Sequence, residues 1–464
     1  MSASRPNIVF VMADDHAAHA ISCYGSRINR TPWIDRLAAE GMRFTNCFCT
    51  NSLCSPSRAT ILTGTYNHVN GVLTLSTPFD ARQPGFPGLL QAAGYQTALV
   101  GKWHLGHGGV HDPRGFDHWC VFPDQGAYHN PEMLERGRPR RLRGYATDLV
   151  TDLAIGWLGR RDPRRPFCLL VHHKAPHRPW LPDDRHAGLY QADRIPEPPT
   201  FGDDYRYRSA AAAQARMRVA DDLGVEDLKA VVPPGLAGDQ RAAWAYQRYI
   251  KDYLRCVASL DDNVGRLLDY LDGAGLTGDT VVAYTSDQGF FLGDHGWYDK
   301  RFMYEESLRM PLLVRYPPEV PEGSLCQAMV LNVDFAQTLL DLAGVPAHPR
   351  MQGRSLRPLL AGRTPPDWRR SMYYRYWEHD DGIHHVWAHY GVRTLGHKLV
   401  YYYADGLGVP GASAVARPPQ WELFDLERDP FELQSVHDDP GYAAVRRQLT
   451  LELARVQAEV GDRP

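Results

Sequence analysis

The stretch Asn7-Ile8-Val9-Phe10-Val11-Met12-Ala13-Asp14-Asp15 decides the fold class of this chain. Its apolar part, residues 7–13, has the length and composition of a strand that is buried on both faces of a sheet. Comparable runs recur at residues 96–100, 167–172, 280–285 and 310–315, and helical patterns such as 32–40 and 86–93 lie between them. Strands that alternate with helices in this way predict an α/β domain with a largely parallel sheet.

The second half of the chain begins with the strongest helical pattern. It covers residues 240–272, where apolar side chains from Tyr253 to Leu271 recur at steps of four and three. A Pro- and Arg-rich passage at 348–370 then predicts a long connection. Beyond it, residues 372–377, 390–394 and 398–403 have strand character, and 442–460 is typical of an amphipathic helix. We therefore expect a large α/β domain over residues 1–365 and a smaller α+β domain with an antiparallel sheet over residues 366–464.

Composition and charge exclude several classes of protein. The 464 residues are 44% hydrophobic and 23% charged, and 51 basic against 54 acidic side chains give a net charge of −3. This balance provides no global attraction to nucleic acid or to an anionic membrane, so any anion recognition is local. Residues 1–16 have no long apolar stretch behind a basic head, which argues against a signal peptide and predicts a cytoplasmic protein. Eight cysteines in a chain of this length do not predict a disulfide framework.

Acidic and amide side chains follow two of the predicted strands. Asp14 and Asp15 come directly after the first strand, and Asp287 and Gln288 come just after the strand at 280–285. Because the carboxyl ends of parallel strands meet at one edge of a sheet, these side chains are expected to lie close together. Their oxygens would form a cage that suits calcium or magnesium and not zinc. For either pair alone, a turn or a helix cap is an equally valid interpretation.

A third feature is Cys54-Ser55-Pro56-Ser57-Arg58, which continues to Leu62-Thr63-Gly64. Pro56 suits the first turn of a helix and Gly64 its end, so Cys54 is expected near a helix N-terminus, where a partial positive charge favours anions. Two interpretations are open from these residues alone. Cys54 is either a small buried residue ahead of a helix or the position of a nucleophile.

Together these features resemble the type I sulfatases of the alkaline phosphatase superfamily, whose maturation signature is Cys-x-Pro-Ser-Arg followed by Leu-Thr-Gly. The resemblance covers nearly the whole chain, and it implies an alkaline phosphatase-like catalytic domain over residues 1–365 with a C-terminal subdomain. Many members carry asparagine where this chain has Gln288, which leaves direct metal binding by Gln288 open. Further landmarks of the family occur in the same order, namely Gly101 to Gly106, Ala175-Pro176-His177, Ser286 to Gly289 with Lys300, and Trp421 to Leu426.

The resemblance implies hydrolysis of a sulfate ester by a formylglycine. A formylglycine-generating enzyme, as maturation partner, oxidises Cys54, and the hydrated aldehyde attacks sulfur and later expels sulfate as the aldehyde re-forms. One calcium ion is implied, with magnesium as the less favoured alternative. The metal ligands that the resemblance implies are Asp14, Asp15, position 54, Asp287 and Gln288.

The same resemblance assigns a role to each remaining polar residue of the site. Sulfuryl transfer spreads negative charge over several oxygens, so positive groups are needed around it. Arg58 would hold the diol and the carboxylates, and Asp287 would accept the diol proton. Lys102, Lys300 and His177 would bind sulfate. His177 would also protonate the leaving oxygen, and His104 would act as the base that assists collapse of the sulfated intermediate.

The sequence says less about the substrate. Residues 172–177, 373–377 and 389–394 look similar to bacterial carbohydrate sulfatases of the N-acetylglucosamine-6-sulfatase kind, and aromatic rings with arginine suit a sugar surface. Arg375, His389 and Arg393 are therefore candidate substrate contacts, while the tyrosines of these segments suit a strand core equally well.

Three alternatives to a carbohydrate sulfatase stay open. They are a phosphonate or phosphate monoester hydrolase, an arylsulfatase, and a non-catalytic protein that binds sulfated sugars with Cys54 unmodified. The expected substrate is a small molecule or an oligosaccharide, with no nucleic acid and no membrane as partner. The sequence predicts no oligomeric state.

Overall fold

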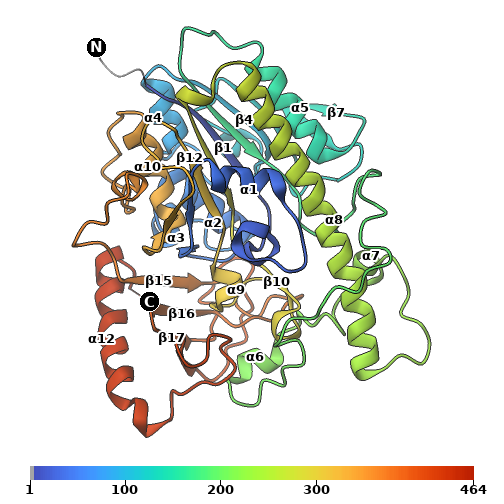
Figure 1. The fold of residues 1–464 in the computed structure, drawn as a ribbon. Helices are drawn as coiled ribbons and strands as arrows, with labels where there is room; N and C mark the ends of the chain where they lie inside the picture. The colour runs from blue at the N-terminus through green and yellow to red at the C-terminus, as the bar shows by residue number, and fades with distance from the viewer. Residues whose placement is uncertain (1–4, 464) are drawn as a thin grey trace.

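A ten-stranded mixed sheet forms the middle of the large domain in the computed structural model, which describes residues 5–463 (Figure 1). Residues 1–4 lie outside the described part, and they belong to the segment 1–16 in which the sequence predicts no signal peptide. The strands of this sheet are β1 (Asn7–Ala13), β2 (Met42–Phe44), β4 (Gln96–Lys102), β5 (His118–Phe122), β6 (Glu132–Glu135), β7 (Arg138–Arg141), β8 (Phe167–His172), β9 (Thr280–Ser286), β12 (Leu312–Arg315) and β13 (Ser324–Cys326).

The strand order is β13-β2-β12-β9-β1-β8-β4-β5-β6-β7. The five central strands, from β9 to β5, run parallel to one another. β12 joins β9 in the antiparallel sense, as does β6 with β5 and β7 with β6. This arrangement confirms the predicted α/β sheet with a parallel centre. Toward the margins most pairs are antiparallel, although β13 pairs with β2 in the parallel sense.

Helices cover both faces of the sheet (Figure 1). On one face α8 contacts α1 and α5, and on the other α10 contacts α2 and α4. This cover explains why β1 and β8 consist of apolar, buried residues along almost their whole length. The helices are α1 (Pro32–Ala39), α2 (Cys54–Thr63), α3 (Asn67–Asn70), α4 (Phe86–Ala92), α5 (Ala146–Leu158), α6 (Ala210–Gln214), α7 (Val225–Leu228), α8 (Gly238–Gly273), α9 (Glu305–Leu308), α10 (Phe335–Leu342) and α11 (Arg357–Leu360).

The register of the central strands aligns their carboxyl ends. β1 pairs with β9 so that Ala13 lies beside Ser286, and with β8 so that Met12 lies beside His172. β8 in turn pairs with β4, and Gly101 lies beside His172. Because all four strands are parallel, the segments that follow them leave the sheet at one edge, where open α/β sheets bind their ligands.

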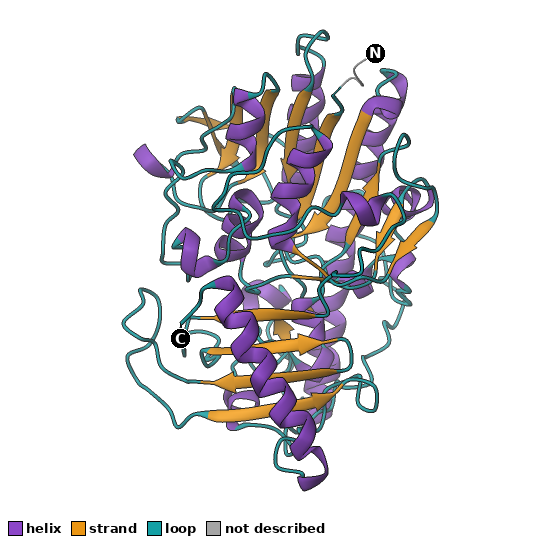
Figure 2. Ribbon diagram, turned by 90° about the vertical axis from the view of Figure 1, so that its left-hand side faces the viewer, coloured by secondary structure: helices purple, strands orange, loops and turns teal. Residues whose placement is uncertain are grey.

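A separate four-stranded antiparallel sheet forms the C-terminal domain, with α12 (Ala443–Val460) crossing its strands (Figure 2). This confirms the expected antiparallel sheet. The Tyr374 hydroxyl joins this sheet to the large domain, because it accepts a hydrogen bond from the Ser52 backbone N–H (3.1 Å) and donates to the Arg301 carbonyl (2.6 Å). In order, the strands are β15 (Ser371–Tyr376), β16 (His389–Thr394), β17 (His397–Tyr402) and β18 (Gln420–Asp425).

Several elements lie where the sequence patterns did not predict them. β18 and the hairpin of β6 and β7 are the clearest cases, since β7 reads Arg138-Pro139-Arg140-Arg141 and has no apolar face. Two pairs of very short strands, β3 (Cys47–Phe48) with β14 (Val330–Leu331) and β10 (Phe291–Leu292) with β11 (Tyr298–Asp299), were also not predicted. Among the helices of residues 5–463, none has the length and apolarity that would let it cross a membrane.

Candidate active site

Three buried carboxylates meet at the edge where β1 and β9 end. Oxygen atoms of Asp14, Asp15 and Asp287 lie within 4.8 Å of one another, and each of these residues is at most 1% exposed. The Asp15 backbone N–H donates to Oδ1 of Asp287 (3.1 Å), and Asp15 adopts a left-handed conformation with φ 67°. The parallel pairing of β1 with β9 therefore brings together two acidic segments that are more than 270 residues apart. We call these three residues the carboxylate cage.

Cationic side chains contact each member of the cage. Arg58 Nε donates to Oδ2 of Asp287 (2.9 Å), and the Lys300 Nζ lies 2.7 Å from Oδ1 of Asp15. Lys102, the last residue of β4, donates to Asp14 and to the Gln125 side chain. The structure thus brings Arg58, Lys102 and Lys300 together around the cage.

The pKa values of the three carboxyl groups differ because their surroundings differ. Burial opposes ionisation of Asp14, but Lys102 and other cations outweigh it and hold the pKa of Asp14 well below its usual range. At Asp15 the effect of burial is larger than that of the nearby cation Lys300, and the pKa of Asp15 is raised to about 6. Burial, reinforced by the charge of Asp14, raises the pKa of Asp287 to about 7. A bound divalent cation would favour the ionised form of all three.

The donor set of the cage fits a hard divalent cation. Carboxylate oxygens are the ligands that calcium and magnesium prefer. Gln288 lies beside them, since its Nε2 donates to Oδ1 of Asp15 and lies 3.7 Å from the Cys54 Sγ. Its Oε1 is buried and has no hydrogen-bond partner among the described residues. Rotation of the amide exchanges its oxygen and nitrogen, so Gln288 is able to offer a fourth oxygen to the cage.

Cys54 is the first residue of α2 and lies beside the cage. Its thiol donates to Oδ1 of Asp14 (3.6 Å). Gly64 caps the C-terminus of α2 with a φ of 62°, which only glycine adopts freely. Burial raises the pKa of Cys54 to about 12, so the thiol stays protonated at neutral pH. Position 54 therefore has the surroundings of a nucleophile, while the thiol itself is a poor one.

Two histidines from different strand ends complete the cluster. His177 Nδ1 donates to the Arg178 carbonyl (2.7 Å), and its Nε2 lies 3.8 Å from Oδ2 of Asp15. Burial, with Lys102 as the next cause, lowers the pKa of His177 well below its usual value. Burial and then Lys102 also lower the pKa of His104 to about 4. Both imidazoles are therefore neutral at neutral pH.

A hollow of about 370 Å³ adjoins this cluster at His104. Ser55 and His104 line its inner end, and the Ser55 hydroxyl donates to the His104 carbonyl (2.6 Å). Its outer walls include Leu134 of β6 and Asp124, a largely exposed residue whose Oδ1 lies 3.2 Å from Nε2 of His104.

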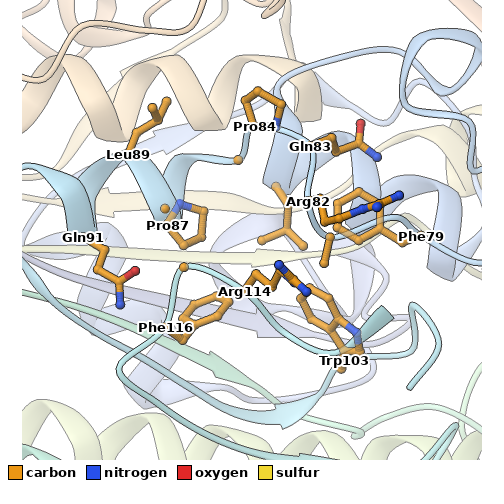
Figure 3. Close-up of a pocket in the computed structure, with 15 residues that line it drawn as sticks. Phe79, Arg82, Gln83, Pro84, Pro87, Leu89, Gln91, Trp103, Arg114 and Phe116 are labelled. Atoms are coloured by element: carbon orange, nitrogen blue, oxygen red, sulfur yellow. The ribbon is translucent and has the colours of Figure 1, made fainter. Parts of the chain in front are cut away.

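A second hollow, of about 340 Å³, lies against α4 (Figure 3). Phe79, Arg82, Arg114, Phe116 and Trp103 surround it. Neither hollow is lined by a cage residue. Trp103 is part of both walls, whereas Ser55 and His104 line only the first. The second hollow therefore lies next to the site but holds none of the groups that the chemistry needs.

The three candidate substrate contacts lie in the C-terminal sheet and are engaged there. Arg375 Nη1 pairs with Asp462 (2.8 Å), and Arg393 Nη2 pairs with Glu305 (3.0 Å). His389 is fully buried, and its Nδ1 donates to the Trp387 carbonyl (2.7 Å). The structure records no contact between these side chains and the cage. The tyrosines of β15 are buried as well, which is the strand-core alternative that the sequence left open.

One residue that contacts the site has no signal in the sequence. Tyr253 belongs to the apolar stripe of α8, yet its hydroxyl donates to the Asp15 carbonyl (2.8 Å) and accepts from the Ala17 backbone N–H (2.9 Å). These two bonds hold the left-handed turn at Asp15. At helical spacing a tyrosine is indistinguishable from ordinary core, so only the structure identifies it.

We expect Tyr253→Phe to weaken binding of a divalent cation about tenfold, the cost of one buried hydrogen bond. The ring and its stacking on Phe290 are kept, so the protein should still fold. Calcium titration followed by calorimetry measures the change. Tyr249→Phe is the matched control, because its hydroxyl lies on the same helix and donates to the Phe291 carbonyl, away from the cage. Equal affinities in the two variants would show that Tyr253 does not position Asp15.

Comparisons with known proteins agree over the whole chain. Residues 6–345 match the family model described as Sulfatase, and residues 293–459 match the model described as N-sulphoglucosamine sulphohydrolase, C-terminal. The N-acetylglucosamine-6-O-sulfatase of Bacteroides thetaiotaomicron is 42% identical over an alignment of 503 positions, gaps included, which covers 99% of this chain and 87% of that protein. The multifunctional alkaline phosphatase superfamily protein PehA of Trinickia caryophylli is 26% identical, covering 96% and 91%.

Solved structures extend these similarities. A protein solved in complex with its substrate D-glucosamine-2-N,6-O-disulfate matches with a TM-score of 0.93 at 41% identity, covering 99% of this chain and 98% of that one. The phosphonate monoester hydrolase of Agrobacterium radiobacter matches with a TM-score of 0.77 at 23% identity, covering 98% and 96%. At that identity the likeness is one of fold alone.

Proposed function

Because this chain belongs to the sulfatase family and is a sulfatase, a hydrolase of sulfate esters, we propose that it removes the 6-O-sulfate from glucosamine in a sulfated carbohydrate. The 42% identity to an N-acetylglucosamine-6-O-sulfatase over 99% of the chain carries this proposal. The likeness in fold to a protein that binds a 6-O-sulfated glucosamine supports it. The phosphonate hydrolase shares only the fold and gives no support for phosphonate as the substrate.

The proposed nucleophile is a formylglycine made from Cys54 by a maturation enzyme. Hydrated formylglycine supplies an oxygen nucleophile and a means of releasing sulfate afterwards. The motif from Cys54 to Gly64 supports the modification, and so does the burial of a thiol that stays protonated at neutral pH. Arg58 lies one helical turn beyond Cys54 and pairs with Asp287, so helix α2 positions both residue 54 and a member of the cage.

The proposed metal is calcium, held by Asp14, Asp15, Asp287 and the amide oxygen of Gln288. A bound calcium ion would neutralise negative charge on the sulfate and on the nucleophile. The cage itself supplies hard oxygen donors at the ends of two rigid, buried strands, β1 and β9. Rigid supports of this kind fix ligand positions before the substrate arrives.

The remaining side chains act on charge and protons. Lys102 contacts Asp14 and Lys300 contacts Asp15, and the two cations would balance the sulfate anion. His177 keeps a proton on Nδ1 and turns Nε2 toward the cage, so a bound anion would raise its pKa and let it protonate the leaving oxygen. His104 is neutral and would accept a proton through Nδ1, 3.4 Å from the Ser55 hydroxyl.

A panel of sulfated sugars tests the proposed substrate. The protein is first shown by mass spectrometry to carry an aldehyde at position 54, and sulfate release is then measured for glucosamine 6-sulfate, glucosamine 3-sulfate and galactose 6-sulfate. We expect kcat/KM for glucosamine 6-sulfate to exceed the others at least ~100-fold, as in sites that read hydroxyl or amide groups by hydrogen bonds. An aryl phosphonate serves as the control. Faster turnover of galactose 6-sulfate or of the phosphonate would contradict the proposal.

A further inference from the structure

The hairpin of β6 and β7 carries an unusual density of arginine. Five of the eight residues from 136 to 143 are arginine, in a chain whose net charge is −3. All five are exposed, and β7 is the last strand of the ten-stranded sheet. Figure 1 shows it at the outer margin of the large domain. We call residues 136–143 the arginine hairpin; its arginines are Arg136, Arg138, Arg140, Arg141 and Arg143.

Five arginines of this hairpin face two carboxylates, since Glu132 and Glu135 lie across the strands from Arg141 and Arg138. Within residues 5–463, Arg140 is the one member of the hairpin with an acidic partner inside 4.0 Å, namely Glu135 at 3.0 Å. Three other exposed arginines are each neutralised by an aspartate two positions earlier. These neutralised pairs are Arg82 with Asp80, Arg164 with Asp162, and Arg206 with Asp204.

The strand geometry spreads these arginines along an extended surface. Arg138 and Arg140 point to one face of the strand, about 7 Å apart, and Arg141 points to the other. The guanidinium fork matches the planar edge of a carboxylate and two oxygens of a sulfate. Charged residues and proline protect an edge strand from pairing with another chain, and β7 has both, but this protection does not explain why the charges are all positive.

The hairpin also adjoins the active site. Leu134 of β6 pairs with Val121 of β5 and lines the hollow that begins at Ser55 and His104. β6 runs antiparallel to β5, so its first residue, Glu132, lies toward the carboxyl end of β5, at the edge of the sheet that carries the cage. Arg141 is the cross-strand partner of Glu132 and therefore lies at this edge.

We propose that the arginine hairpin binds sulfate and carboxylate groups of a sulfated glycan chain that extends from the glucosamine in the active site. This rests on the proposed function, because the sugar in the active site is taken to be part of a longer, negatively charged carbohydrate. The chain as a whole is slightly acidic, so attraction to such a polyanion is local to this surface. The contacts are exposed, and their strength falls with salt.

Binding of a heparin hexasaccharide tests the proposal without turnover. Cys54→Ala protein is titrated at low salt, with and without the three changes Arg138→Gln, Arg140→Gln and Arg141→Gln. We expect these changes to raise the Kd about tenfold, from roughly twofold for each exposed charge contact. The difference should shrink as salt is added. In protein that keeps its native residue at position 54, the three changes should leave kcat/KM for glucosamine 6-sulfate unaltered.

Two control variants keep the result interpretable. The triple change Arg194→Gln, Arg206→Gln and Arg428→Gln removes the same charge from exposed sites elsewhere and should alter the Kd less than about twofold. The second control is the triple change Arg138→Lys, Arg140→Lys and Arg141→Lys, which keeps the charge and should retain most of the affinity. If the glutamine variant fails to fold, loss of affinity in this lysine variant would contradict the proposal.

Three outcomes would overturn the hairpin proposal. The first is an unchanged Kd in the glutamine variant, and the second is an equal loss in the charge-matched control. The third is equal competition by single-stranded DNA of the same charge, which would assign the surface to polyanions in general. Failure of every variant to release sulfate from glucosamine 6-sulfate would instead refute the proposed substrate. The Kd values for heparin would still decide whether the arginine hairpin binds a sulfated glycan.

Discussion

Replacing Cys54 by alanine is expected to reduce sulfatase activity by about 10⁵-fold, the scale on which removal of a covalent nucleophile acts in other hydrolases. Alanine cannot be oxidised to formylglycine, and no other side chain in the cluster replaces it. The fold should persist, because the change removes only the Sγ contacts with Asp14 and Gln288 at 3.6 and 3.7 Å. Loss of this one buried atom costs about 1 kcal/mol of unfolding free energy. Sulfate release and thermal melting together measure the two effects.

Cys49→Ala provides the matched control. Cys49 is also fully buried and lies five residues before Cys54. Its thiol donates to the Ser307 carbonyl (3.8 Å) and not to a cage residue. Burial raises the pKa of Cys49 to about 12, as it does for Cys54, so the two thiols differ in position and not in acidity. We expect Cys49→Ala to melt like Cys54→Ala and to keep its activity. Turnover by Cys54→Ala within tenfold of the unmodified chain would remove position 54 from the reaction.

The cage could be predicted because its signals are local and its assembly follows from topology. Apolar runs that end in Asp14-Asp15 and Asp287-Gln288 indicate two parallel strands with oxygen donors at the same edge. The structure makes these strands neighbours, β1 and β9, in a register that leaves both acidic segments beyond the last paired residues. That adjacency itself was not predictable from the periodicity of either strand, since any two strands of a parallel sheet have the same apolar pattern.

Other features could not be predicted because the deciding partner lies far away in the chain. Arginines among tyrosines in β15 and β16 suit a sugar platform, yet Arg375 and Arg393 are held by Asp462 and Glu305, which no local pattern connects to them. Tyr253 has the spacing of core and the hydrogen bonds of a site residue. The arginine hairpin shows the reverse case, because its composition is plain in the sequence while its strand pairing and its place beside the hollow are not.

Removing the metal is expected to lower activity about 10³-fold, which corresponds to several kcal/mol of charge stabilisation at the reacting group. Dialysis against a chelator followed by addition of calcium or magnesium measures the loss and identifies the ion that restores activity. Asp287→Asn should cause a comparable loss that calcium does not restore. Asp294→Asn is the matched control, because Asp294 is a buried carboxylate of the same segment that pairs with His19 and lies outside the cage. Full activity in metal-free protein would eliminate the metal from the mechanism.

The metal-free and calcium-bound proteins should also respond differently to pH. The pKa of Asp287 is raised to about 7 and that of Asp15 to about 6, so without a cation these groups bind more protons in the folded than in the unfolded protein between about pH 4 and pH 7. The stability of metal-free protein therefore falls as pH rises through this range and stays lower above it. Calcium binds the ionised carboxylates and must displace these protons at low pH. The increase in Tm on adding calcium is thus expected to be larger at pH 8 than at pH 5, and an increase that does not change with pH would show that the cation binds elsewhere.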